Sequence, residues 1–192
     1  MKQPWNHNIH YHPQILKAVP HGAERALDIG CGEGMLARKL RRVVPDVTGI
    51  DLDTPSLEQA RGQGDDIEYV HGDFLEQPLE PASYDVVASV ATLHHVDART
   101  GLLRMRELVR PGGVLVVVGL ARTTPRDLPY AAAAVTASYA HRATKGLWEH
   151  PSPTVWPPPV TFHDMRTLAA DLLPASTYRR HLLFRYSITW RK

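Results

Sequence analysis

A glycine-rich turn between a short apolar run and an amphipathic run constrains this chain more than any other stretch. Residues 26–34 read ALDIGCGEG, with glycines at alternate positions, and the amphipathic run of residues 35–43 follows at once. Glycine adopts backbone angles that other residues avoid, and it lets a ligand approach the main chain closely. A helix that opens after Gly34 directs unpaired N–H groups at the same point. The pattern predicts a strand, a tight turn and a helix that cradle a nucleotide or cofactor.

The spacing of these glycines bears on which cofactor the turn accepts. The dinucleotide-binding fingerprint is G-x-G-x-x-G. Gly30 and Gly32 fit it, but Met35 stands at the third position and the extra glycine, Gly34, comes one residue early. The spacing therefore disfavours an NAD(P)-dependent oxidoreductase, which remains an alternative.

Two acidic residues follow the next two predicted strands. Asp51 ends the second strand about twenty residues past the loop, where folds of this kind hold a ribose hydroxyl pair. Asp73 and Phe74 follow the third strand. A carboxylate can accept a hydrogen bond from an exocyclic amine, and an aromatic ring can stack on adenine. These residues predict an adenosine site at the edge where the glycine turn lies.

Five segments match one protein family in order and spacing. They are ALDIGCGEG, GIDLD (49–53), GDF (72–74), YDVVAS (84–89) and LVRPGG (108–113). Together they resemble the motifs of class I S-adenosylmethionine-dependent methyltransferases, closely over residues 23–120 and loosely beyond them. The resemblance implies S-adenosyl-L-methionine as cofactor. It also implies a seven-stranded sheet of order 3-2-1-4-5-7-6 whose last strand is antiparallel.

Strands that alternate with helices predict an α/β fold, a Rossmann-like three-layer sandwich with a mostly parallel sheet. We expect one domain over residues 1–192, with an amino-terminal cap at 1–22. Residues 121–163 break the alternation, and a long insertion at this edge predicts an acceptor lid. Residues 111–113, Pro-Gly-Gly, predict a turn. The expected strands are 25–29, 47–51, 67–70, 84–90, 114–119, 177–183 and 186–190, and the expected helices are 14–19, 35–43, 54–61, 97–109 and 161–173.

The family resemblance also implies which residues bind the cofactor. The backbone of the glycine turn would hold the methionine part, Asp28 would orient that turn, and Leu52 would lie against the adenine. Cys31 is interpreted as a small buried residue and not a nucleophile, because no base stands beside it. The expected cofactor-binding residues are Tyr11, Asp28, Gly30, Cys31, Gly32, Gly34, Asp51, Leu52, Asp73, Phe74 and Ser89.

The amino-terminal residues 5–12 contain three histidines and two aromatic rings. A shared helix face for His7 and His10 would suit a metal ion, but no Cys, Asp or Glu stands nearby, so we expect no metal site. In the family an amino-terminal segment often covers the cofactor, and Tyr11 would then hydrogen-bond the methionine carboxylate. In the equally weighted alternative, Trp5 and Tyr11 pack on the domain edge.

The segment after the fourth strand, residues 89–95, reads SVATLHH. It lacks the Asn/Asp-Pro-Pro-Tyr-like run of enzymes that methylate exocyclic amino nitrogens. His94 and His95 are the candidate catalytic bases, because imidazole titrates near neutral pH and can deprotonate a hydroxyl, phenol or amine. The alternative is that the pair only supports the loop. The lid region contains two tryptophans, Trp148 and Trp156, which would either wall the acceptor or anchor the lid to the body. Three histidines in or near the lid are further candidate bases: His141, His150 and His163.

Composition narrows the function classes. The net charge of +2 does not require a polyanionic partner, and the single cysteine excludes an internal disulfide. The apolar run of residues 114–121 is too short to span a membrane, and residues 1–20 do not resemble a signal peptide. We therefore expect a cytoplasmic enzyme acting on a small organic molecule, without nucleic-acid or membrane partners, and its oligomeric state stays open.

Other functions on the same fold keep some weight. One is a non-catalytic protein that binds S-adenosylmethionine and serves a partner, because fold does not fix function. Methylation of RNA or protein is less favoured, and its support is a cationic cluster that we otherwise interpret as a solvated face. The cluster consists of Arg166, Arg179, Arg180, Arg185, Arg191 and Lys192.

Overall fold

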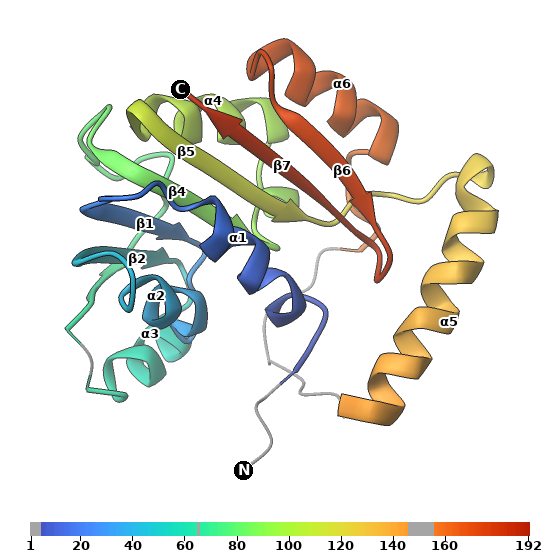
Figure 1. The fold of residues 1–192 in the computed structure, drawn as a ribbon, viewed down its shortest axis with the longest axis horizontal. Helices are drawn as coiled ribbons and strands as arrows, with labels where there is room; N and C mark the ends of the chain where they lie inside the picture. Colours follow the sequence, from blue (N-terminus) through green and yellow to red (C-terminus); the bar gives the residue numbers. More distant parts are fainter. Residues whose placement is uncertain (1–4, 65, 146–155) are drawn as a thin grey trace.

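The computed structural model describes residues 5–64, 66–145 and 156–192, and its centre is a seven-stranded sheet (Figure 1). The strand order is β3-β2-β1-β4-β5-β7-β6, and β7 runs antiparallel to both of its neighbours. This confirms the predicted fold class and topology. The strands are β1 (Arg25–Ile29), β2 (Asp46–Asp51), β3 (Glu68–His71), β4 (Tyr84–Val90), β5 (Val109–Gly119), β6 (Thr177–His181) and β7 (Arg185–Arg191).

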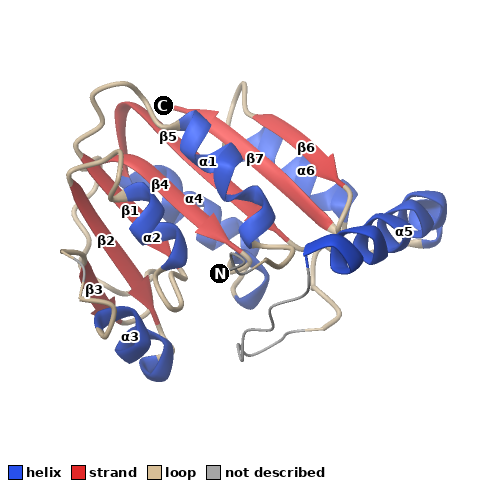
Figure 2. Ribbon diagram, turned by 60° about the horizontal axis from the view of Figure 1, so that its bottom comes forward, coloured by secondary structure: helices blue, strands red, loops and turns tan. Residues whose placement is uncertain are grey.

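Helices cover both faces of the sheet, with α1 and α2 on one face and α4 and α6 on the other (Figure 2). Alternation along β5 shows why there are two cores: Val114, Val116 and Val118 pack on the first face, whereas Leu115 and Val117 pack on the second. Strands buried on both faces are therefore apolar throughout. The helices are α1 (His12–Ala18), α2 (Met35–Leu40), α3 (Thr54–Arg61), α4 (Ala98–Leu108), α5 (Leu128–Lys145) and α6 (Phe162–Leu172), with short 3-10 turns η1 (Ile9–Tyr11), η2 (Leu93–His95) and η3 (Pro125–Asp127).

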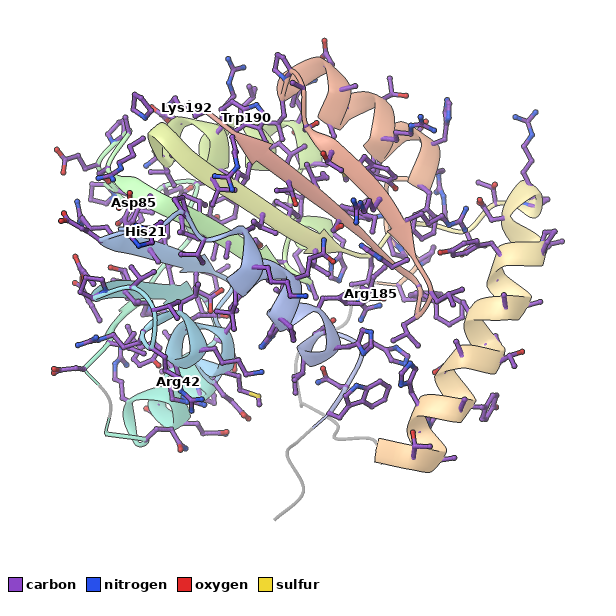
Figure 3. The ribbon with its side chains drawn as sticks, in the orientation of Figure 1. His21, Arg42, Asp85, Arg185, Trp190 and Lys192 are labelled. Carbon is purple, nitrogen blue, oxygen red and sulfur yellow. The ribbon has the colours of Figure 1, made fainter. Side chains whose placement is uncertain are left out.

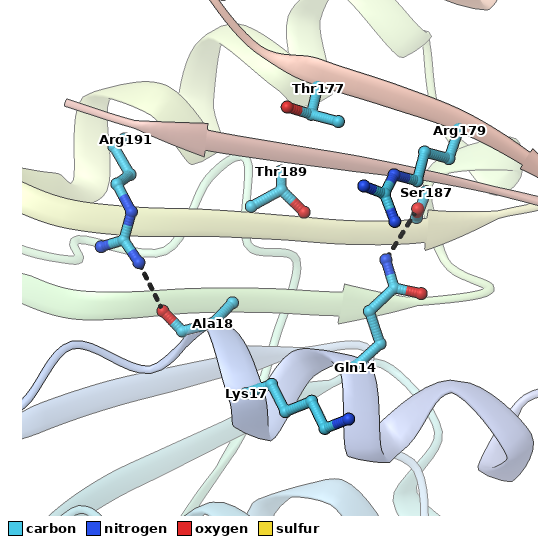
Figure 4. A pocket seen from close by; sticks show the side chains of 8 residues that line it. All are labelled: Gln14, Lys17, Ala18, Thr177, Arg179, Ser187, Thr189 and Arg191. Carbon is cyan, nitrogen blue, oxygen red and sulfur yellow. Dashed lines mark hydrogen bonds between the residues drawn. The ribbon is translucent and has the colours of Figure 1, made fainter.

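Helix α1 reaches across to the antiparallel end of the sheet (Figure 4). Gln14 donates from Nε2 to Ser187 Oγ at 2.9 Å, and Arg191 donates to the carbonyl of Ala18 at 3.2 Å. These bonds tie the amino-terminal segment to β7, so it is part of the domain body.

Residues 111–113, where a turn is predicted, belong to the start of β5 but interrupt its pairing with β4, which resumes at Val114 after a register shift, and Gly112 has φ +80°. The chain end explains the difference. The N–H of Gly112 donates to the carbonyl of Lys192 at 2.8 Å, and the N–H of Lys192 donates to the carbonyl of Gly113 at 3.1 Å. A partner 79 positions away in sequence therefore keeps these residues in the ladder. Helix α2 is also shorter than predicted and ends at Leu40.

The insertion after β5 contains the 18-residue helix α5, which stands to one side of the sheet (orange in Figure 1). Asp127, just before α5, pairs with Arg180 of β6. The same guanidinium lies 4.2 Å from the ring centroid of Tyr130 and 4.0 Å from that of Phe162. Arg180 thus anchors the base of the insertion to the sheet.

Asp85 of β4, labelled in Figure 3, should contribute strongly to stability. Its side chain is 2% exposed, accepts from the N–H groups of Glu24 and Arg25 at 3.0 and 2.9 Å, and pairs with Arg110. Asp85→Ala leaves these donors unsatisfied, so we expect the free energy of unfolding in urea to fall by about 3 kcal/mol.

The control is Asp46→Ala, because Asp46 forms an ion pair with Arg25 at 3.2 Å while its side chain remains 58% exposed. An exposed pair contributes less than about 1 kcal/mol. Equal losses for the two variants would contradict the structural role given to Asp85.

Candidate functional site

A cleft of about 830 Å³ opens at the carboxyl ends of the parallel strands. This is where α/β sheets bind ligands, because the loops after the strands converge there. The amino-terminal segment and the start of β7 close its other side. Among the residues predicted for cofactor binding or catalysis, the cleft is lined by Asp28, Gly30, Cys31, Gly32, Asp51, Leu52, Asp73, Phe74, His94 and His95.

The glycine turn is held by main-chain bonds and leaves no room for a side chain at its first position. The N–H groups of Gly30 and Cys31 donate to the carbonyl of Ile50 at 2.8 and 3.1 Å. Gly30 has φ +72°, and a Cβ atom there would lie 1.9 Å from Thr92 Oγ1. Only glycine fits this position, which sets the turn against the end of β4.

Asp28 of β1 is 1% exposed and lines the cleft. Its Oδ2 atom has no hydrogen-bond partner, and burial raises the pKa of the carboxyl to about 7. A buried carboxylate oxygen without a donor is costly, so a cationic ligand group beside it is favoured. The α-ammonium of S-adenosylmethionine is such a group.

Asp51 at the end of β2 links two loops of the cleft. Its Oδ2 accepts from the N–H of Gly32 at 2.7 Å, and its Oδ1 accepts from the N–H of Asp53 at 2.9 Å. Each carboxylate oxygen has two lone pairs, so Asp51 can still accept from ligand hydroxyls. This geometry allows it to bind a ribose and to shape the turn at the same time.

The residues after β3 and β2 supply an adenine-sized surface. Asp73 uses Oδ1 to accept from the N–H of Leu75 at 2.9 Å, which leaves Oδ2 for a ligand. The neighbouring Phe74 is buried, whereas Leu52 is exposed on the cleft wall. An exposed apolar side chain beside an acid suits a flat base with an exocyclic amine.

Three predicted cofactor residues do not line the cleft. Gly34 caps α2 with φ +73° against the hydroxyl of Tyr69, and Ser89 is fully buried and donates to the carbonyl of Ile29 at 3.0 Å. Both residues therefore support the glycine turn without lining the cleft. The Tyr11 hydroxyl donates to the carbonyl of Leu182 in the β6–β7 connection. Its position in this structure corresponds to the packing alternative, and a bond to the methionine carboxylate stays a prediction.

Cys31 lines the cleft but is not activated. Burial raises the pKa of its thiol far above neutrality, and the nearby carboxylates of Asp28 and Asp51 add to the shift. The thiolate is the nucleophilic form of cysteine, so Cys31 is inert at neutral pH.

His94 and His95 form η2 and lie beside each other, with ring centroids 4.1 Å apart. His94 is 8% exposed, and its Nδ1 atom has no hydrogen-bond partner. Burial, with the charges of His95 and Arg185, lowers the pKa of His94 to about 4. His94 is therefore a neutral imidazole at pH 7. His95 is exposed, and partial burial lowers its pKa less strongly.

Arg185 is a cleft residue that sequence reasoning missed. It was grouped with the solvated arginines near the chain end, but it is 8% exposed and lines the cleft. Its Nε and Nη2 atoms donate to Asn8 Oδ1 at 3.0 and 2.7 Å. The available signal is its place next to the predicted strand 186–190, because the structure extends that strand by one residue and makes Arg185 the buried first residue of β7.

The predicted lid residues are only partly described. Trp156 is 68% exposed and does not line the cleft, while Trp148 and His150 lie outside the described residues. His141 of α5 stacks on Trp5 at 5.2 Å between centroids, and His163 is exposed on α6. The contact through His141 connects the insertion to the amino-terminal segment.

The residues that the structure describes offer neither a cluster of metal ligands nor a membrane-spanning helix. In that part of the chain, no group of three or more His, Cys, Asp or Glu side chains has a metal-binding arrangement. Likewise, none of the described helices combines the length and apolarity needed to cross a membrane.

Comparison with known proteins decides the family. An uncharacterized methyltransferase of Mycobacterium tuberculosis is 43% identical over 195 residues, which cover 100% of this chain and 98% of the relative. The chain belongs to the class I S-adenosylmethionine-dependent methyltransferases. The family model described as a methyltransferase domain matches residues 27–117 of this methyltransferase. The motifs therefore predicted the family, the enzyme class and the cofactor correctly.

More distant relatives are similar over part of the methyltransferase or in fold. A ubiquinone biosynthesis O-methyltransferase of Maricaulis maris is 35% identical over 112 residues, 55% of this chain and 44% of that protein. The crystal structure of the YcgJ protein from Bacillus subtilis has a TM-score of 0.64 at 18% identity, over 90% of this chain and 71% of that one. Phosphoethanolamine N-methyltransferase 2 of Haemonchus contortus, solved with S-adenosyl-L-methionine, has a TM-score of 0.61 at 21% identity, over 88% and 38%.

Proposed function

We propose that this methyltransferase methylates a hydroxyl oxygen of a small organic acceptor, with His94 as general base. The observation that carries the proposal is a neutral, buried imidazole that lines the cofactor cleft and has an Nδ1 atom without a hydrogen-bond partner. The O-methyltransferase names of relatives that match about half of the chain favour oxygen as the methylated atom.

The residues at the carboxyl ends of β1, β2 and β3 would bind the cofactor. S-adenosylmethionine supplies an electrophilic methyl group on a sulfonium, and its leaving thioether is neutral. The glycine turn and Asp28 would hold the methionine part, Asp51 the ribose hydroxyls, and Asp73 the adenine amine beside Leu52 and Phe74. Because the leaving group is good, the enzyme contributes mainly positioning and the exclusion of water.

His94 would act on the acceptor. Its imidazole would take the proton of the acceptor hydroxyl, whose oxygen would receive the methyl group that S-adenosylmethionine supplies. A neutral imidazole is required for this step, and burial keeps His94 neutral. His95 is exposed and would contribute less.

The acceptor side of the cleft and the insertion agree with a small molecule. Ile9, Val96 and Leu120 provide apolar lining in the cleft that His94 also lines. Helix α5 contacts the amino-terminal segment that lines the cleft, with Ser138 Oγ 2.9 Å from His7 Nε2, which supports the interpretation of the insertion as an acceptor lid. A single domain with a cytoplasmic location and no nucleic-acid partner is part of this proposal.

The test combines calorimetry with an acceptor screen. Titration with S-adenosylmethionine, S-adenosylhomocysteine and NADH should give micromolar binding of the first two only. A screen of phenols, hydroxy acids and amines, followed by release of S-adenosylhomocysteine, should then give turnover with hydroxyl compounds. Methylation of amines alone would refute the oxygen assignment. Cofactor binding without any turnover would favour a non-catalytic partner protein.

Cofactor affinity should depend on pH through Asp28. In the free protein this carboxyl takes up a proton as the pH falls through about 7, whereas a bound ammonium group favours the ionised form. The complex therefore binds fewer protons, and affinity for S-adenosylhomocysteine should be full near pH 8 and about tenfold lower at pH 6. Asp28→Asn should remove this dependence; a slope that persists in the variant would assign it to another group.

A further inference from the structure

A buried arginine faces the acceptor half of the cleft without a counter-charge. Arg185 begins β7 at the sheet edge next to the amino-terminal segment, as Figure 3 shows. Its acceptors are all neutral: Asn8 Oδ1, and the carbonyls of Leu183 and Phe184 at 3.4 Å each. Among the described residues, no carboxylate lies within 4.0 Å of its guanidinium nitrogens.

The other groups around Arg185 do not supply negative charge either. Burial lowers the pKa of His7 and of His94 to about 4, and the Arg185 charge adds to both shifts. Tyr11, whose pKa burial raises to about 12, is neutral as well. A buried charge normally has a partner, because removing it from water is costly. Nothing in this neighbourhood repays that cost, so a ligand anion is the missing partner.

The bonding of the guanidinium leaves space for that anion. One edge, Nε and Nη2, is taken by Asn8, which fixes the plane of the group. Nη1 reaches its two carbonyls only at 3.4 Å, a weak distance for an N–H donor. The edge formed by Nη1 and Nη2 can therefore donate to a carboxylate or phosphate in the paired geometry that arginine favours.

We infer that Arg185 binds an oxyanion of the methyl acceptor, so that the substrate is an organic acid bearing a carboxylate or phosphate close to the methylated hydroxyl. This rests on the proposed function. Arg185 and Asn8, which holds it, line the cleft together with His94, the proposed base, and the Arg185 charge is one of the causes of the low pKa of His94. The place of Arg185 is on the acceptor side of the cleft.

An acceptor oxyanion bound to Arg185 would also change the basicity of His94. An oxyanion paired with Arg185 cancels part of the positive charge that disfavours protonation of His94. His94 then becomes a stronger base only when an anionic acceptor is bound. Neutral acceptors lose both the contact and this activation.

The first experiment separates the acceptor anion from the carboxylate of the cofactor. Arg185→Gln removes the charge, and Arg185→Lys keeps it and serves as the matched control. S-adenosylhomocysteine carries the methionine carboxylate, whereas 5′-methylthioadenosine lacks the whole amino-acid part. We expect calorimetric affinities for both ligands to stay within twofold in both variants. A tenfold loss in Arg185→Gln for S-adenosylhomocysteine alone would place the cofactor carboxylate on Arg185 and overturn the inference.

The second experiment uses matched acceptors. Hydroxybenzoates, aliphatic hydroxy acids and hydroxyl-bearing phosphate monoesters are compared with their amides or neutral esters, and carboxylate and phosphate series are scored separately. We expect the wild-type enzyme to prefer the acids at least tenfold in kcat/KM, Arg185→Gln to abolish the preference, and Arg185→Lys to retain part of it. Equal use of neutral acceptors by the wild-type enzyme would overturn the inference.

A measurement without turnover keeps the inference testable if the proposed reaction is wrong. In the complex of the ¹⁵N-arginine-labelled protein with S-adenosylhomocysteine, the Nε–H resonance that disappears in Arg185→Lys belongs to Arg185. Titration with benzoate or phenyl phosphate should shift this resonance saturably, while benzamide should not. A saturable shift in an enzyme that methylates only nitrogen would retain the anion site and refute the O-methylation; no shift would refute the anion site.

Discussion

Gly30→Ala should reduce the affinity for S-adenosylhomocysteine on the order of a hundredfold, about 2.7 kcal/mol at 25 °C. The added Cβ would lie 1.9 Å from Thr92 Oγ1 and 2.7 Å from Thr92 Cβ, so the turn and the end of β4 must separate. Thr92 Oγ1 also donates to the carbonyl of Ile29 at 3.2 Å, which resists that movement. The φ of +72° adds backbone strain for any residue with a Cβ. Calorimetric titration of the folded variant measures the loss.

The matched control is Gly22→Ala. Gly22 has nearly the same φ, +73°, but a Cβ there meets nothing within 4 Å. It should show the cost of the backbone angle in its melting temperature and leave cofactor affinity unchanged. Equal affinities for Gly30→Ala and Gly22→Ala would mean that the turn does not shape the cofactor site.

His94→Ala should lower kcat for the best acceptor of the screen on the order of 10² to 10⁴-fold, the usual contribution of a general base. Affinity for S-adenosylhomocysteine should remain within about twofold, because the proposed role of His94 concerns the acceptor. Steady-state kinetics measure the change in kcat, and calorimetry measures the affinity for S-adenosylhomocysteine separately.

His95→Ala is the control, because His95 is adjacent in sequence but exposed. It should cost less than about tenfold, since an exposed imidazole excludes little water from the reaction. Similar losses in both variants would instead favour the interpretation in which the pair only supports the loop. Full activity in His94→Ala would refute the assignment of the base.

Much of the fold could be predicted because its signals are local. The apolar run of β4 and the glycine turn each determine their own element, and the order of strands and helices restricts the sheet to few topologies. Ligands of α/β folds bind at the carboxyl ends of the parallel strands, and this predicted that Asp28, Asp51 and Asp73 lie around one cleft. Asp51 ends a predicted strand, Asp28 stands one residue before the end of another, and Asp73 comes three positions after a third, so no long-range information was needed.

The features that were missed depend on partners distant in sequence. Tyr11 is turned toward the carbonyl of Leu182, 171 positions away, and Arg185 is held by Asn8, 177 positions away. Composition around Arg185 indicates a cationic surface, and only the packing of the β6–β7 connection against the amino-terminal segment shows that it is buried. The inclusion of residues 111–113 in β5 depends on a distant partner as well, because Gly112 and Gly113 pair with Lys192.

The pairing of Lys192 with the start of β5 has a practical consequence for work with this enzyme. Lys192 Nζ also donates to the carbonyl of Val109 at 2.7 Å, so the last residue is fixed at the sheet edge opposite the cleft. Asn6, His7 and Ile9, in contrast, line the cleft itself. An affinity tag or immobilisation linker attached at Lys192 therefore stands away from the cleft, whereas one attached at Asn6, His7 or Ile9 stands at its wall.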